Sequence, residues 1–290
     1  MSCVKKIKRN FLTVSLITIM LLPLQAFSID NVNGNIKALN SQGGLYVSGS
    51  YKVGFFDVED FLINETVFNG TQTKNKLQLS KDSKEVNPLR FRDHFKEKYK
   101  PPVFDRSYLN FTGAVGYLQN NVRIELECSY EYSDVQDDDS YVVKDNRRFI
   151  SLVRGETISN GIAGTNYIIA ENKGIASVSL IFNMCYDIIP EYTYVIPYLC
   201  AGAGGEFINM FDTVKMKLNY QGKIGLSYKI MSNVVAFVDG YYHGIADNKF
   251  DHLKVIVPDL LLSYPKASSS ATANANIGYM GVNLGVRFIL

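Results

Sequence analysis

The sequence predicts an all-β protein, an eight-stranded antiparallel up-and-down transmembrane β-barrel with long external loops. Three observations lead to this prediction. Eight segments alternate apolar and polar residues with the period of two that belongs to a β-strand. The connections between them are long at some positions and short at others, in near alternation, and a secretory signal precedes them all. A soluble β-sandwich has no reason to sort its loops by length in this way.

The first 28 residues have the layout of a secretory signal peptide. A basic start and an apolar run over 11–24 are followed by small residues. The run is short for a membrane-spanning helix, which needs about 20 residues. We therefore expect cleavage after Ala26 or Ser28, and we assign residues 29–290 to one outer-membrane β-barrel domain.

The clearest strand is expected at 122–133. All its even-numbered residues are apolar or aromatic, whereas its odd-numbered residues are polar or charged. A helix would mix these two rows around its surface, so the period indicates a strand with two distinct faces.

The other seven strands repeat this alternation with varying clarity. They are expected at 44–55, 107–118, 174–186, 192–207, 217–229, 234–245 and 275–290. The segment 192–207 is the least regular, because both of its rows are mostly apolar and Pro197 interrupts it. Eight is an even number, so the barrel closes without leaving an unpaired edge.

The connections separate into two kinds. Residues 119–121, 187–191 and 230–233 are short turns, whereas 208–216 is a loop of medium length. Three long polar segments, at about 57–105, 134–172 and 246–273, show no sustained strand period. Long loops on one side and short turns on the other are typical of outer-membrane barrels.

The two rows of each strand have opposite expected environments. An Arg or Lys on the lipid face costs about 2–4 kcal/mol at the bilayer midplane, so charges are expected inside. The predicted lumen-facing charges are Lys52, Arg123, Glu125, Glu127, Glu131, Lys223, Lys229, Asp239 and Arg287. The predicted lipid-facing residues are Val122, Ile124, Leu126, Leu180, Phe182, Leu226, Val286 and Phe288.

The polar interior has two interpretations. Charges of both signs allow ion pairs across the lumen, and an eight-stranded interior is just wide enough for side chains to fill. This geometry favours a plugged barrel over a narrow path for small hydrophilic solutes. The residues leave both open.

Other classes of function find little support in the sequence. The three histidines form no HExxH pattern, and the chain has no GxSxG, P-loop or dinucleotide-binding motif, so we expect neither an enzyme nor a cofactor or metal site. His243, near the rim, is interpreted as structural, and Asp137–Asp139 as a solvated acidic loop. A net charge of +2 with no basic patch argues against a nucleic-acid partner.

Cysteine usage adds one open question. Three cysteines remain after the signal peptide, Cys128, Cys185 and Cys200. An odd number rules out a fully paired framework, and Cys128 lies in an apolar row as a small hydrophobic residue. Pairing of Cys185 with Cys200 stays open.

Five blocks of the chain resemble the major surface antigens of ehrlichial and anaplasmal (rickettsial) bacteria. They are Gly43–Tyr51, Val122–Tyr132, Ile196–Gly205, Gln221–Tyr228 and Gly285–Phe288. The resemblance implies an immunodominant outer-membrane β-barrel of an obligate intracellular bacterium, whose paralogues differ mainly in their external loops. Some members of that family are described as porins, and the family supplies no catalytic residues.

These observations together predict a surface antigen in the bacterial outer membrane. We expect its barrel to contact outer-membrane lipid, with both termini in the periplasm. The long loops are expected to meet host-cell surface molecules or antibodies, as antigens or as adhesins. The alternative is a porin that passes small solutes.

Overall fold

The computed structural model describes residues 44–66, 73, 75–84, 94–144, 146–153, 167–190, 194–257 and 270–290. The expected signal peptide and parts of the long loops lie outside these residues. Within the described ranges, no helix is long and apolar enough to cross a bilayer.

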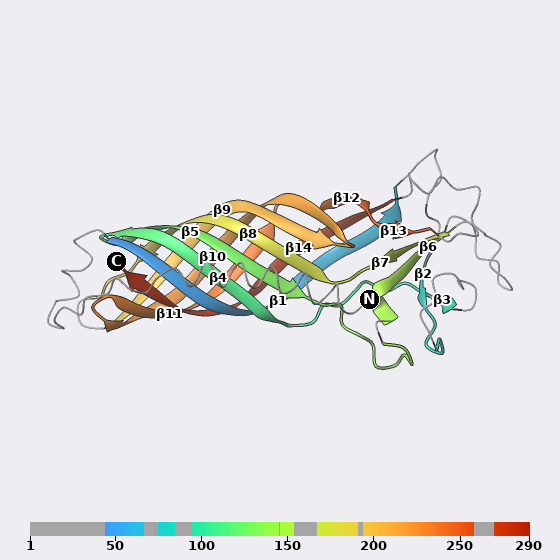
Figure 1. Ribbon diagram of the computed structural model, residues 1–290, viewed down its shortest axis with the longest axis horizontal. Coiled ribbons are helices and arrows are strands. Elements are labelled where there is room, and N and C mark those ends of the chain that lie inside the picture. The colour runs from blue at the N-terminus through green and yellow to red at the C-terminus, as the bar shows by residue number, and fades with distance from the viewer. Residues whose placement is uncertain are drawn as a thin grey trace.

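Eight strands form a closed antiparallel ring. Figure 1 shows it from the side, with the long axis of the molecule horizontal. Each strand pairs with the next, and the first pairs with the last, so the predicted number, order and direction of the strands are confirmed. The ring consists of β1 (Gly44–Glu65), β4 (Ser107–Gln119), β5 (Val122–Ser133), β8 (Ile175–Asp187), β9 (Val195–Met210), β10 (Thr213–Met231), β11 (Val234–Ile245) and β14 (Ala271–Ile289).

Several strands are longer than the sequence predicts. β1 continues to Glu65, past an irregularity between Glu59 and Leu62, so the expectation of a loop from about 57 is wrong there. Beyond Phe55 the apolar residues of β1 change sides. Asp57 and Glu59 point outward and are exposed, whereas Phe61 on the inner side is buried. This part of the strand has the polarity of a water-soluble protein.

The predicted loop at 208–216 is also wrong. β9 and β10 are joined by Phe211 and Asp212 alone, both with positive φ, at 52° and 54°. Two consecutive residues with positive φ make the tight turn that suits the twist of a hairpin. The usual Asn or Gly is missing from both positions, which is why the sequence does not reveal the turn.

The long connections build a second sheet of five strands at one end of the barrel (Figure 1). We call it the distal sheet. Its strands in spatial order are β13 (Val255–Ile256), β7 (Tyr167–Glu171), β6 (Phe149–Val153), β2 (Asn75–Leu79) and β3 (Phe95–Lys98). The expectation that these segments lack strands is therefore wrong in part. A further strand, β12 (Lys249–Leu253), pairs with β14, and a short 3-10 helix, η1 (Asn146–Arg148), precedes β6.

The connections from β4 to β5, from β8 to β9 and from β10 to β11 lie at the opposite end. The backbone N–H of Leu290 donates to the carbonyl of Leu45 there, which closes the ring next to the turn between β10 and β11. Three long connections at one end and three short ones at the other agree with the sorting that the sequence indicates, and the turn between β9 and β10 is one short connection at the end of the distal sheet.

Candidate functional site

The barrel interior collects the charges that the sequence predicts to face the lumen. Eight of the nine are buried inside the ring, each with at most 8% of its surface exposed, and Lys229 is half-buried near the turn into β11. The buried ones are Lys52, Arg123, Glu125, Glu127, Glu131, Lys223, Asp239 and Arg287.

The residues predicted to face lipid lie on the outer surface. Val122, Ile124, Leu126, Leu180, Phe182 and Leu226 are exposed, and Val286 and Phe288 are partly exposed. With other outward residues they form a continuous apolar band around the barrel. Its area is far larger than that of the apolar patches on the surface of a soluble protein.

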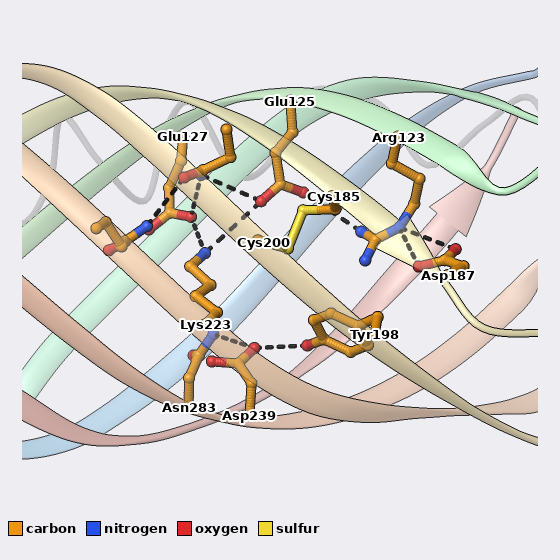
Figure 2. The surroundings of a disulfide bond; sticks show 12 residues. Arg123, Glu125, Glu127, Cys185, Asp187, Tyr198, Cys200, Lys223, Asp239 and Asn283 are labelled. Atoms are coloured by element: carbon orange, nitrogen blue, oxygen red, sulfur yellow. Dashed lines mark hydrogen bonds and ion pairs between the residues drawn. A yellow bond between two sulfur atoms is a disulfide. The ribbon is translucent and has the colours of Figure 1, made fainter.

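Glu127 is the centre of the largest ion cluster. Its carboxylate pairs with Lys223 and lies 3.3 Å from the Lys52 ammonium. Lys52 also lies 3.3 Å from Glu131. Lys223 lies 3.6 Å from Glu125 (Figure 2). Three carboxylates thus surround two ammonium groups. Lys52 comes from β1 and Lys223 from β10, which lie on either side of β5 in the ring.

Neutral side chains complete the hydrogen bonds of this cluster. The Asn183 amide donates to Glu125 at 3.2 Å and to Glu127 at 3.0 Å. The Tyr46 hydroxyl donates to Glu125 at 2.8 Å. Buried carboxylates need such donors, because a charge left without them in a low-dielectric interior is very unfavourable.

Arg123 lies nearer the short turns. Its Nε donates to both oxygens of Asp187, at 2.9 and 3.0 Å, and its Nη1 lies 3.5 Å from Glu125 (Figure 2). Beside it, Cys185 and Cys200 occupy directly opposed positions on β8 and β9 and form a disulfide. This disulfide settles the question of pairing that the sequence leaves open. Cys128 is a free cysteine.

A third buried group lies nearer the distal sheet. The Tyr279 hydroxyl donates to Glu206 at 2.8 Å, and His243 Nε2 lies 2.9 Å from the same carboxylate. Sequence analysis missed Glu206, because it falls in the segment whose two rows are both mostly apolar. His243 is fully buried, and its ring stacks on that of Tyr279 with the centroids 4.1 Å apart.

The interior becomes apolar where it meets the distal sheet. Side chains from the ring and from one face of β6 and β7 form a single buried group, which we call the mouth cluster. It includes Phe56, Phe61, Ile150, Leu152, Ile168, Ala170, Ile208, Phe211, Phe250 and Ile277. The alternate residues of β6 and β7, Val153, Tyr167 and Ile169, pack on the other face with Leu79 and Phe95. The distal sheet therefore closes this end of the barrel.

Polar contacts order the connection before β6. Hydrogen bonds from Ser140 and then from Arg147 hold the pKa of Asp138 well below its usual value. Burial raises the pKa of Glu97, but hydrogen bonds from Tyr141 and from the Lys81 backbone outweigh it and lower the pKa. The acidic run therefore contains one structural residue, Asp138, between two exposed ones.

Comparison with known proteins identifies the family. The model of the surface antigen family matches residues 38–290. Major surface antigen 4 of Anaplasma marginale is 28% identical over 247 residues, which cover 85% of this chain and 84% of that protein. The resemblance stated from the sequence blocks is thus confirmed.

Two solved outer-membrane proteins have a similar fold at low sequence identity. Neisserial surface protein A is 12% identical with a TM-score of 0.40, and the alignment covers 86% of this chain and 99% of that one. OprG from Pseudomonas aeruginosa is 11% identical with a TM-score of 0.45, covering 86% and 98%. The closed ring of eight strands with its apolar outer band is a transmembrane β-barrel, and by the family match over residues 38–290 this chain belongs to the surface antigen family.

Proposed function

We propose that this chain displays the distal sheet to the host and that its barrel serves as a closed anchor. The observation that carries the proposal is the convergence of the long connections on one end of the barrel. Such an arrangement gathers the loops, which tolerate sequence variation, on one surface above a rigid scaffold. In this proposal the short turns and both termini face the periplasm.

Surface labelling tests the orientation. An epitope inserted after the exposed Asp139 should bind antibody on intact cells. The same epitope inserted after Asn233, in the turn between β10 and β11, is the matched control and should bind only after the cells are permeabilised. Labelling of the control alone on intact cells would reverse the proposed orientation.

Host contact is the second part of the proposal. We propose that the distal sheet and its loops bind a host-cell surface molecule, in addition to antibodies. Beads coated with the refolded full chain should adhere to host cells, and an antibody against the epitope at Asp139 should block the adhesion. Equal adhesion of beads coated with an unrelated barrel would refute the adhesin part of the proposal.

A porin is the alternative, and the charged interior favours it. Two observations favour the closed anchor instead. The mouth cluster fills one end of the lumen, and between the charges there is a cavity of only about 10 Å³. An apolar constriction of this kind also excludes ions by keeping water out.

Conductance in a planar bilayer distinguishes the two. We expect the unaltered chain to be silent, whereas a variant with both Leu152→Ser and Ile168→Ser, which loosens the mouth cluster, should conduct. Discrete conductance steps from the unaltered chain would establish the porin and refute the closed anchor.

A further inference from the structure

The outer face of β10 is apolar along almost its whole length. Its outward residues are Val214, Met216, Leu218, Tyr220, Gly222, Ile224, Leu226, Tyr228 and Ile230. Apart from Gly222, each of them has between 47% and 68% of its surface exposed. On β1, in contrast, the outward residues become acidic beyond Phe55. The apolar outer face is therefore longer on β10 than on β1.

Strand pairing allows heights on β1 and β10 to be compared. A path that starts at Phe55 and steps around the ring between directly opposed residues returns to β1 at Leu45. It passes through Met280, Tyr242, Gly222, Ala201, Met184, Ile124 and Tyr117. Its eight steps therefore descend by ten residues of β1, away from the distal sheet, which is the shear of this barrel.

The same path gives the residue of β10 that is level with Phe55. Gly222 is three steps from Phe55, so it lies lower by about four residues. The residue level with Phe55 is therefore Leu218, and Met216 and Val214 lie still nearer the distal sheet. With a rise of about 3.3 Å per residue and a tilt of about 40°, Met216 and Val214 are about 5 and 10 Å beyond that level.

At this height the two sides of the barrel have opposite polarity. Asp57 and Glu59 face outward on β1 and are exposed. Met216 and Val214 on β10 are 67% and 60% exposed, and Phe207, directly opposite Met216 on β9, is 54% exposed. We call Phe207, Val214 and Met216 the apolar ridge. Contact of such large apolar side chains with water is unfavourable, so the ridge favours an apolar partner.

Lipid fits the ridge better than a protein partner does. The ridge continues into the apolar band through Leu218 and Tyr220, with no polar outward residue of β10 between them. A bilayer adapts to an apolar face taller than its hydrocarbon layer, either by local thickening or by tilt of the protein. A stable protein interface needs about 20–30 residues on each side, which is far more than the ridge offers.

We propose that lipid of the leaflet nearest the distal sheet covers the apolar ridge. The acyl chains and glycerol groups there contact Met216 and Val214, so the membrane reaches about 10 Å farther toward the distal sheet at β10 than at β1. Asp57 and Glu59, at the same heights, lie in water. This lipid contact holds whichever end of the barrel faces the host, so it is independent of the proposed display function.

Tryptophan fluorescence tests the contact, because the chain has no Trp of its own. Met216→Trp and Val214→Trp each place one probe on the ridge, whereas Asp57→Trp and Glu59→Trp place it at matching heights on β1. Each full chain is refolded into phosphatidylcholine vesicles. Acyl chains brominated close to the glycerol quench a probe from the lipid, and iodide on both sides of the membrane quenches it from water. We expect bromine to quench the ridge probes more strongly than the β1 probes by about twofold or more, and iodide to show the reverse order.

Leu226→Trp, within the apolar band, is the control that bromine should quench and iodide should not. All five positions are exposed on the outer surface, so the changes leave the interior packing intact, and gel mobility checks that each variant is folded. If one ridge variant does not refold, the other decides. Equal quenching of the ridge and β1 probes by either reagent would overturn the proposal. Ridge probes that neither reagent reaches would overturn it as well, because protein would then cover them.

Discussion

The cluster around Glu127 permits a strict test, because removing one charge and removing two have different expected results. Glu127→Gln removes the carboxylate that pairs with Lys223 and lies 3.3 Å from Lys52. Both ammonium groups then remain buried with fewer counter-charges. Breaking a buried ion pair on one side costs about 3–5 kcal/mol. We expect about 3 kcal/mol, the lower end, because Lys52 keeps Glu131 at 3.3 Å and Lys223 keeps Glu125 at 3.6 Å.

Adding Lys223→Met to Glu127→Gln removes the orphaned cation as well. Replacing a buried ion pair by apolar or neutral groups of similar volume is often neutral in stability. We therefore expect the double variant to recover most of the loss. The two single changes should then be coupled by about 3 kcal/mol, at the upper end of the range for residues in direct contact.

The assay is urea-induced unfolding of the barrel refolded in lipid vesicles. Tyrosine fluorescence reports it, since the chain has 19 Tyr and no Trp, and the mobility of folded and unfolded barrel on a gel gives a second signal. Asp139→Asn, at an exposed position, is the control and should change the free energy of unfolding by less than about 0.5 kcal/mol. If the losses of the two single variants simply add in the double variant, the charges do not compensate one another and the reasoning fails.

Three further predictions concern the hairpins and the distal connections. Replacing Cys185 and Cys200 by Ser opens a closed loop with a sequence separation of 15 and should cost about 3 kcal/mol, measured by the same urea unfolding. Gly204→Ala should cost about 1–3 kcal/mol, because the added Cβ would lie 2.0 Å from the backbone carbonyl oxygen of Leu180. In the control Gly222→Ala the added Cβ meets nothing within 4 Å, so that change should be tolerated. Similar Tm values for the two variants would contradict this. Because the pKa of Asp138 is lowered in the fold, the stabilisation that it gives to the turn before η1 is fully present above the ordinary aspartate value of about 3.9. It declines below that value and is lost as the pH falls through the lowered pKa of the folded chain. Protection of that turn from hydrogen exchange, taken relative to the intrinsic exchange rate at each pH, should therefore fall on acidification in the unaltered chain. An equal fall in Asp138→Asn would show that the carboxylate is not responsible.

Strand period sufficed to predict the ring. In β5, the parity of the residues separates the inner row from the outer row over the whole strand, and the structure buries the odd-numbered side chains. Parity does not say which charges meet. Lys52 and Glu127 are 75 residues apart and come together only through the register of β1, β4 and β5. The disulfide likewise depends on the opposed positions of Cys185 and Cys200 across a hairpin whose second strand has an indistinct period.

The distal sheet was beyond prediction for a related reason. Its strands have five residues or fewer and pair across long distances in the chain, as where Leu77 on β2 meets Ser151 on β6. Short strands carry too few alternations to stand out from a polar loop. The continuation of β1 to Glu65 is also hard to predict, because the irregularity after Glu59 shifts the alternation of inward and outward residues that follow.

The change of polarity along β1 also locates the membrane. Its outward residues are apolar, apart from glycine, from Leu45 to Phe55, and the next outward residues are Asp57 and Glu59. Ten residue steps at about 3.3 Å, tilted by about 40°, span about 25 Å, which is the height of the apolar band of an outer-membrane barrel. Inside the ring the order is reversed, with charges at the level of the band and the mouth cluster beyond it. Along β1, the level of the apolar band is thus apolar outside and polar inside, and the next level is polar outside and apolar inside. Beyond the bilayer the barrel has an apolar interior, the mouth cluster, as a water-soluble protein does. This core gives the distal sheet a rigid base.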